Sequence, residues 1–257
     1  MWNYLLWALF FSLFVNIVMF VVAYSLKTDK LTDISYALSF MCITVACLFQ
    51  VPLTPYRVVL AAMIVLWAMR LGGFLLLRIW VAGKDHRFDA VRTNFWSFGT
   101  FWVSQGFSVW IILLPTMLAL RYEHRAIGWV SILGLVVWLG GLLLESFADA
   151  QKFLFSLHKE NRTKWIESGL WRYSRHPNYF GEITVWVGVL IFCCVSLPWL
   201  EIVVGAISPA FIASLLLFVS GIPILEKKAD ERWGKLAAYK AYKRSTSMLV
   251  PWPRSNG

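Results

Sequence analysis

The chain has 257 residues, of which 59% are hydrophobic and 17% aromatic, and its mean hydropathy is +0.65. Soluble domains are usually about half apolar, so this composition excludes an ordinary soluble protein and predicts a multi-pass membrane protein. The formal net charge is +10, which by itself fits either a nucleic-acid-binding protein or a membrane protein with basic loops.

Seven apolar runs approach the ~20 residues that a helix needs to cross a bilayer. The first run has no basic segment before it and is longer than the core of a signal peptide, so we expect a spanning helix and no cleaved leader. The predicted spans are 4–25, 34–51, 58–80, 95–120, 127–144, 179–197 and 202–225. The sequence therefore predicts an all-α, polytopic protein with about seven transmembrane helices, folded as one membrane domain over residues 1–257 without internal repeats.

The basic residues are distributed unequally between the two sides of this topology. Twenty of the 24 Lys and Arg residues fall in loops on one side, and only Arg57, Arg121 and Arg125 fall on the other. Because basic loops stay in the cytoplasm, the amino terminus is predicted outside and the carboxyl terminus inside. This distribution explains the net charge without nucleic acid, and it indicates the inner membrane of a bacterium, or the endoplasmic reticulum if the source is eukaryotic.

Several common site types have no matching motif in the chain. All four cysteines lie in apolar runs, which argues against disulfides and thiolate metal sites, and the four histidines form no HxxxH pair. The chain also lacks GxxxxGK[ST], a GxGxxG motif between a strand and a helix, and a GxSxG elbow. A bound nucleotide would therefore need a fold unlike the usual soluble ones.

The third span and the loop that follows it carry arginines of possible functional use. Arg70 lies midway along the span, where an arginine usually faces an internal polar cavity, although it can also only stabilise the bundle. Arg87 and Arg92 in the following loop can pair with a phosphate through their planar guanidinium groups. A solvated loop of mixed charge is the equal alternative for these two residues.

Two acidic residues mark the end of the fifth predicted span. Glu145 and Asp149 are four residues apart and so share one face of a helix. Two stacked carboxylates repel each other unless they accept hydrogen bonds, for example from ribose hydroxyls or an arginine. They can also simply pair with Lys152 or Arg175.

The stretch 169–182 is the densest polar and aromatic run in the chain. Arg175 and His176 precede a Pro-Asn turn signal, and Asn178 and Glu182 open the next apolar helix. A carboxylate about one turn inside an apolar helix is costly unless it has a partner or a function. We therefore expect this stretch to hold a charged cofactor at the membrane edge, the alternative being a basic loop that only anchors the helix.

A basic amphipathic tail with Tyr239 and Tyr242 follows the last span. Such a tail often lies on anionic lipid, and its aromatic residues can also cover a cytosolic pocket. Both possibilities stay open at this point.

Taken together, these residues resemble the membrane reductases related to steroid 5α-reductase. The resemblance covers about residues 145–251 and rests on the order of Glu145 and Asp149, 164–171, 173–182 and the tail tyrosines. The run 220–228 resembles the bacterial branch. The resemblance implies a seven-helix enzyme that uses NADPH to reduce an activated carbon-carbon double bond in a lipophilic substrate that is steroid-, isoprenoid- or lipid-like. Separately from the resemblance, we expect the protein to be a monomer.

The resemblance also implies roles for individual residues. Asn178 and Glu182 would hold the nicotinamide carboxamide, and Glu145 and Asp149 the adenosine half. Lys164 stands where the family has a cofactor-contacting arginine. Its ammonium is a compact point charge, whereas the planar guanidinium of an arginine can donate two parallel hydrogen bonds to a phosphate. The further cofactor contacts expected from the resemblance are Arg70, Arg87, Tyr173 and Arg175.

The chain departs from this family at the acid that protonates the substrate. Steroid reductases use a Glu and a Tyr from the early helices, and here Gln50 and Trp67 fall at those positions. Neither side chain is an effective acid. Tyr56 and Tyr179 are the alternative donors, and we take Gln50 and Tyr179 as the candidate catalytic residues.

Two rival interpretations stay open. The run 175–181 and the tail also resemble the isoprenylcysteine carboxyl methyltransferases and phospholipid methyltransferases, which bind S-adenosylmethionine. Glu145, Asp149, Lys164, Asn178 and Glu182 favour a longer, phosphate-bearing dinucleotide over that cofactor. A non-enzymatic lipid-binding membrane protein is the third possibility.

Overall fold

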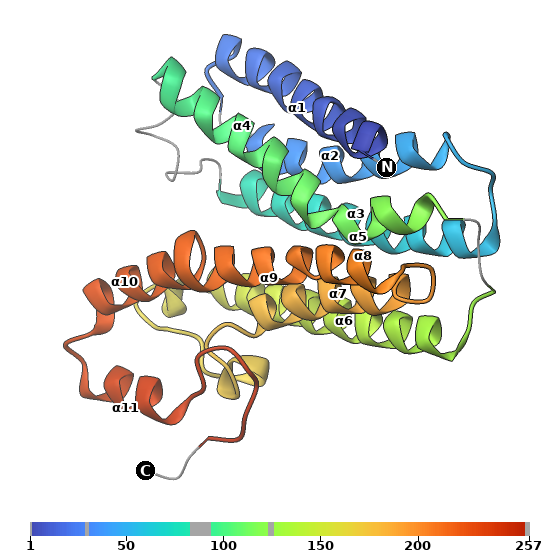
Figure 1. Ribbon diagram of the computed structural model, residues 1–257. Helices are drawn as coiled ribbons and strands as arrows, with labels where there is room; N and C mark the ends of the chain where they lie inside the picture. Colours follow the sequence, from blue (N-terminus) through green and yellow to red (C-terminus); the bar gives the residue numbers. More distant parts are fainter. Residues whose placement is uncertain (1, 29–30, 83–93, 123–125, 255–257) are drawn as a thin grey trace. The chain divides into compact units, whose positions relative to one another are not determined.

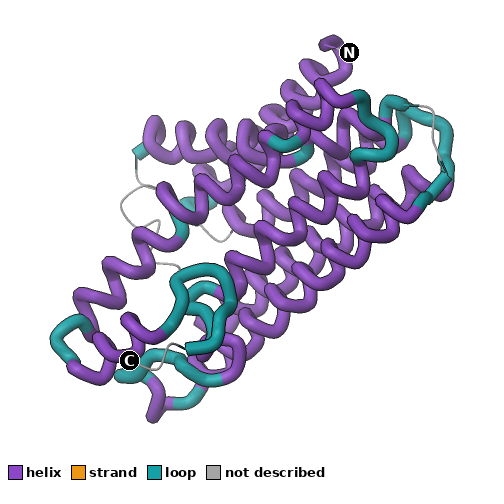
Figure 2. Tube along the Cα trace, turned by 60° about the horizontal axis from the view of Figure 1, so that its bottom comes forward, coloured by secondary structure: helices purple, strands orange, loops and turns teal. Residues whose placement is uncertain are grey.

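The computed structural model describes residues 2–28, 31–82, 94–122 and 126–254, and these form helices and loops (Figures 1 and 2). These residues contain no β-strand; one isolated parallel bridge pairs Ser174 with Ser247. The all-α prediction is confirmed. The chain divides into two compact units, residues 1–132 with 189–208 and residues 133–188 with 209–257.

The first unit is a bundle of helices formed by long apolar runs. In a bilayer such runs become helical because each backbone polar group must be paired within its own segment. Helix α1 packs on α2 and α4, α2 packs on α3, and α5 packs on α8. The rings of Phe20, Phe98 and Trp102 meet edge to face between α1 and α4. The elements are α1 (Trp2–Ser25), α2 (Leu31–Leu48), α3 (Pro55–Ala82), α4 (Phe95–Ile112), α5 (Leu114–Leu120) and α8 (Trp199–Gly205).

A bend of 50° separates α4 from α5. Pro115 lies in the first turn of α5, where its missing N–H and its ring interrupt the helical hydrogen bonds of a continuous span. At the other end of α4, Asn94 Oδ1 accepts a hydrogen bond from Ser97 N (3.0 Å) and so caps the first turn. The predicted fourth span is therefore a bent pair of helices.

Five buried polar side chains connect α1, α2 and α4, and we call them the amide network: Ser12, Asn16, Ser35, Ser39 and Gln105. Gln105 Nε2 donates to Asn16 Oδ1 (3.0 Å) and to Ser35 Oγ (3.1 Å). Asn16 Nδ2 donates to Ser39 Oγ (3.1 Å), and Ser12 Oγ donates to the carbonyl of Gly106 (2.8 Å). Within the described part of the chain, no polar atom of these five side chains is buried without a partner.

The second unit is built on a close pair of helices, α6 (Trp129–Leu157) and α7 (Pro177–Cys193). A Cβ atom at Gly141 would lie 2.6 Å from Val185 N, and one at Gly181 would lie 2.6 Å from Glu145 N. Only glycine allows these two backbones to approach so closely. The remaining elements are η2 (Lys159–Asn161), η3 (Gly169–Arg172), α9 (Ile207–Ser214), the π-helical turn η4 (Leu215–Val219), α10 (Ile222–Trp233) and α11 (Ala237–Ser245).

The protein is a multi-pass integral membrane protein. Four helical segments of the described chain are long and apolar enough to cross a membrane, and the bent pair α4 and α5 makes a fifth if it counts as one span. The other two predicted spans correspond to shorter apolar helices, Ile34–Leu48 and Pro177–Cys193. The count of seven spans, their orientation and the single domain with a cofactor half over 145–251 stay predictions.

Candidate functional site

The second unit contains a cavity of about 590 Å³, a volume typical of small-molecule sites. Its walls come from the end of α6, the segment 158–176, α10 and α11. Six of the lining residues are basic and only one, Glu226, is acidic. The basic residues are Lys152, Arg162, Lys164, Arg175, Lys228 and Arg232, and the aromatic ones are Phe155, Trp165, Trp171, Trp233, Tyr239 and Tyr242.

The positive charge of this cavity is largely uncompensated by the protein. Among the described residues, Arg162, Lys164 and Lys228 have no carboxylate partner. The Lys152 ammonium lies 4.5 Å from the centre of the Trp171 ring, a cation-π contact. A cavity lined by one sign of charge concentrates ligands of the opposite sign, so this one favours anions.

The aromatic side of the cavity is a connected set of rings. Trp165 meets Tyr239 at 5.2 Å and Trp233 at 6.1 Å between ring centroids. The Tyr242 hydroxyl donates to the carbonyl of Trp171 (3.1 Å), and Trp171 Nε1 donates to the carbonyl of Ala148 (3.0 Å). These bonds fix the rings as flat apolar surfaces beside the basic side chains, an arrangement that suits a ligand with both rings and anionic groups.

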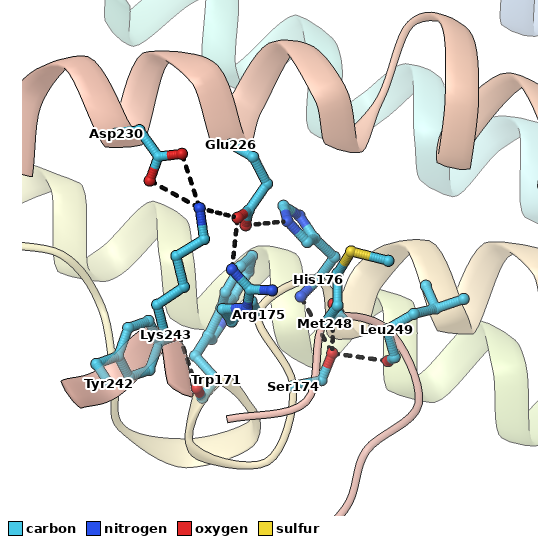
Figure 3. A network of polar contacts seen from close by, with 10 residues as sticks. All are labelled: Trp171, Ser174, Arg175, His176, Glu226, Asp230, Tyr242, Lys243, Met248 and Leu249. Atoms are coloured by element: carbon cyan, nitrogen blue, oxygen red, sulfur yellow. Dashed lines mark hydrogen bonds and ion pairs between the residues drawn. The ribbon is translucent and has the colours of Figure 1, made fainter. Parts of the chain in front are cut away.

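The Glu226 carboxylate of α10 binds three side chains, two from the loop before α7 and one from α11 (Figure 3). Its carboxylate accepts from Arg175 Nη1 (2.5 Å), from His176 Nε2 (3.0 Å) and from Lys243 Nζ (2.9 Å). Lys243 also pairs with Asp230 at 2.7 Å. Burial alone would lower the pKa of Lys243, but its bonds to Asp230 and Glu226 outweigh this and raise the pKa. Glu226, the one acidic residue among the described residues that line the cavity, is thus engaged within the protein.

The C-terminal segment closes onto the loop before α7. Arg175 N donates to the carbonyl of Ser247 (2.8 Å), and Trp252 N donates to the carbonyl of Tyr173 (3.0 Å). Ser174 Oγ donates to the carbonyl of Leu249 (2.7 Å) (Figure 3). Tyr239 and Tyr242 line the cavity, in agreement with the second of the two possibilities for the tail, cover of a pocket; contact of the tail with lipid stays a possibility as well.

His176 is a buried titratable residue of the cavity wall, with 5% of its side chain exposed. Its ring stacks on Tyr179, with centroids 5.6 Å apart and planes 7° from parallel. Burial lowers the pKa of His176, although its hydrogen bond to Glu226 acts in the opposite direction. The imidazole is therefore neutral at pH 7.

Three residues of the cavity wall carry a buried polar atom that no described residue satisfies. These atoms are Trp165 Nε1, Arg175 Nε and His176 Nδ1. Buried polar atoms are nearly always hydrogen-bonded in native proteins, so these three atoms are candidates for hydrogen bonds to a ligand or to water.

The two acidic residues selected from the sequence, Glu145 and Asp149, lie on α6 beside α7. Asn178 Nδ2 donates to Asp149 Oδ1 (3.1 Å), while Asn178 Oδ1 is buried without a partner among the described residues. Glu145 and Asp149 are both buried, and Glu145 lies against Gly181. Glu182 is half-buried on α7 and Tyr173 is exposed. The structure thus brings Asp149 and Asn178 together, and it brings Lys164 and Arg175 to one cavity.

A second set of predicted residues belongs to the first unit. Gln50 is exposed in the turn after α2, and its amide donates to the carbonyl of Ala46 (3.4 Å). Arg70 is half-buried on α3, 5.7 Å from the centre of the Phe74 ring. Tyr56 donates to the carbonyl of Phe192 (3.3 Å), and Trp67 is buried against Phe40. Arg87 and Arg92 lie outside the described residues.

The sequence analysis did not select Glu226 as a site residue. It also did not select three basic residues of the cavity wall, Arg162 and, on α10, Lys228 and Arg232. Glu226 follows Leu225 directly at the end of an apolar run, so the argument applied to Glu182 would have selected it as well. No local sequence pattern indicates that Lys228 and Arg232 line the same cavity as Lys164. In the described parts of the chain, no group of three or more His, Cys, Asp or Glu residues could hold a metal ion.

The cavity and the α6–α7 pair lie within the part of the chain that matches a family profile. The profile described as "Protein of unknown function (DUF1295)" matches residues 19–246, and the chain belongs to this family. No curated protein and no solved structure matches the chain.

Proposed function

We propose that this DUF1295 membrane protein is an NADPH-dependent reductase that binds its cofactor in the cationic cavity of the second unit. Its substrate would be a lipophilic molecule with an activated carbon-carbon double bond, as the resemblance to the steroid 5α-reductase family implies. The observation that carries the proposal is the lining of the cavity, with six basic side chains, six aromatic ones and a single engaged carboxylate.

The charge of the cavity favours a dinucleotide over S-adenosylmethionine. NADPH carries a pyrophosphate and a 2′-phosphate, which basic side chains bind through charge-assisted hydrogen bonds. S-adenosylmethionine carries a sulfonium and an ammonium against one carboxylate, so its net charge is positive. The six basic residues would repel that cofactor, which argues against a methyltransferase.

The residues present fit such a cofactor. Arg162, Lys164 and Lys228 have charges available for phosphate groups, and the rings of Trp165 and Tyr242 offer surfaces for stacking. Asn178 and Asp149 are not among the residues that line the cavity, but the buried Asn178 Oδ1 and the Asp149 carboxylate are acceptors of a type that suits amide N–H and ribose hydroxyl groups. These acceptors agree in type with the roles that the resemblance implies for them.

When bound, NADPH supplies the hydride for the β carbon of the conjugated alkene. The chain must contribute a donor that polarises the substrate carbonyl and a proton for the α carbon. Tyr179 is our candidate for the proton, because its ring stacks on that of His176, which lines the cavity although Tyr179 itself does not. The Gln50 amide can polarise a carbonyl but cannot supply the proton.

The test is to purify the protein in mild detergent, denature it and identify any released nucleotide by mass spectrometry. NADPH and S-adenosylmethionine are then titrated separately into ligand-free protein while the fluorescence of the cavity tryptophans is followed. Release or saturable binding of NADP(H) supports the proposal. Binding of S-adenosylmethionine alone would make the protein a methyltransferase, and binding of neither would favour the lipid-binding alternative.

A further inference from the structure

We infer that His176 Nδ1 is the hydrogen-bond acceptor through which the cavity receives an N–H or O–H group of its ligand, and that Glu226 is the positioning residue that creates this acceptor. The inference rests on the proposed function and extends it. The roles expected from sequence left both residues unassigned.

The tautomer of His176 follows from its contact with Glu226. The carboxylate is held ionised by Arg175 and Lys243, so it accepts hydrogen bonds and cannot donate one. Nε2, which lies 3.0 Å from Glu226 Oε1, must therefore carry the ring proton. A neutral imidazole has one N–H, which leaves a lone pair on Nδ1.

Two observations connect Nδ1 with a ligand. This atom is buried with no donor among the described residues, and His176 is one of the residues that line the cavity. The ring cannot easily turn to find another donor, because Glu226 holds one edge and Tyr179 covers one face. A fixed acceptor in a cavity wall selects ligands that present a donor there.

The neighbours of His176 explain why it complements the cations. The charged groups that act on it are Lys152 from α6, the adjacent Arg175 and Glu226 from α10. Lys152 and Arg175 attract anionic groups but give no acceptor for an N–H or O–H. A ligand served by the whole wall must therefore combine negative charge with a neutral donor, as a nucleotide does through its ribose hydroxyls or a carboxamide, and as a fully ionised phosphate does not.

Two substitutions at the same position separate the acceptor role from a structural one. In His176→Gln, the amide nitrogen can replace Nε2 and keep the bond to Glu226, but no atom takes the position of Nδ1. In His176→Asn, the side-chain oxygen can stay near the position of Nδ1, while the side chain is too short to reach Glu226. Both variants lose the ring that stacks on Tyr179, so this loss is matched between them.

We expect His176→Gln to weaken NADPH binding about three- to tenfold, the effect of one hydrogen bond, and His176→Asn to weaken it less. The readout is the Kd from tryptophan fluorescence. A purely structural His176 would reverse this order, because Gln would keep the Glu226 contact and Asn would lose it. That reversal would overturn the inference.

A spectroscopic readout tests the acceptor without enzyme activity. In protein labelled with ¹⁵N-histidine, His176 should show a protonated Nε2 and an unprotonated Nδ1, and the Nδ1 resonance should move upfield when NADPH binds. The His176→Gln variant assigns the signal. A protonated Nδ1, or an Nδ1 resonance that stays in place on NADPH binding, would overturn the inference and leave the proposed function intact.

The two failures are distinguishable in the same titrations. Wild-type protein that binds no NADPH would overturn the proposed function and the inference with it. Wild-type and His176→Gln proteins that bind NADPH equally well would overturn the inference alone.

Discussion

The amide network of the first unit and the cavity of the second unit treat buried polar groups in opposite ways. In the network, Gln105, Asn16 and their serine partners satisfy one another, and no polar atom of theirs is buried without a partner in the described chain. In the cavity wall, buried atoms of Trp165, Arg175 and His176 have no partner there. A closed polar set stabilises and specifies a membrane bundle, whereas an open one leaves hydrogen-bonding capacity for something that binds.

This difference predicts that substitutions in the amide network change stability alone and that substitutions of the basic residues of the cavity change NADPH binding alone. Substitutions that disturb the packing of α6 on α7 should change both stability and binding. The predictions below test this separation from the largest effect to the smallest.

The largest effect should come from packing in the second unit. Gly141→Ala would place a methyl group 2.6 Å from Val185 N, so α6 and α7 must move apart. We expect the free energy of unfolding to fall by about 3 kcal/mol and NADPH binding to be lost. Gly140→Ala is the control, since nothing lies within 4 Å of its Cβ position. Thermal unfolding in detergent measures the stability of both variants, and a fluorescence titration measures their NADPH binding. Equal melting temperatures for the two variants would contradict the close approach of α6 and α7.

The next effect should come from opening the amide network. Gln105→Leu removes the donor to Asn16 Oδ1 and to Ser35 Oγ. We expect a loss of about 1–2 kcal/mol in the free energy of unfolding, with the Kd for NADPH unchanged in the folded protein. Ser108→Ala is the control, because Ser108 bonds only to Ser104 of its own helix. A weakened Kd in Gln105→Leu would show that the network also serves binding.

A smaller effect should follow from one charge in the cavity. Lys228 lines the cavity, whereas the adjacent Lys227 is equally exposed and does not. Lys228→Gln should weaken NADPH binding about three- to tenfold, the contribution of one charge-assisted contact, while Lys227→Gln should not. Neither change should alter the melting temperature. Titration at low and at high salt measures the electrostatic share, and equal Kd values for the two variants would contradict the proposed phosphate contacts.

The smallest effect should appear as a pH dependence of stability. Burial keeps the pKa of His176 below its ordinary value of about 6.5 in the folded state, so the unfolded chain binds the proton more readily. The contribution of His176 is therefore complete above about pH 6.5 and is lost as the pH falls through the lowered pKa of the folded state. Melting temperatures from about pH 8 to pH 5 should decline less in His176→Gln than in wild type; parallel curves would exclude this source.

The sequence predicted the helical architecture because apolar length alone makes membrane helices. It also selected the stretch 169–182, which supplies Arg175 and His176 to the cavity, because polar residues at a membrane edge are conspicuous. For the tail tyrosines the sequence left two possibilities open, contact with lipid and cover of a pocket.

The rest depended on contacts between distant segments. Glu226 lies 50 or more residues from Arg175 and His176 in sequence, and no local pattern indicates that it holds them. The bend at Pro115 was not predicted, since a membrane helix often accommodates proline without ending. The basic residues of the cavity come from α6, the segment 158–176 and α10, and the periodicity within one segment does not show that these segments meet.

The attachment of residues 246–252 to the loop before α7 has a consequence for biosynthesis. The ribosome delivers α10, α11 and this segment after all the long apolar helices, so a nascent chain has Arg175 and His176 before it has Glu226, Lys243 or Ser247. The wall of the cavity is therefore complete only after α10 and α11 have been synthesised. A ligand bound there would distinguish chains that contain these helices from chains truncated before them, which would insert into the membrane with an incomplete site.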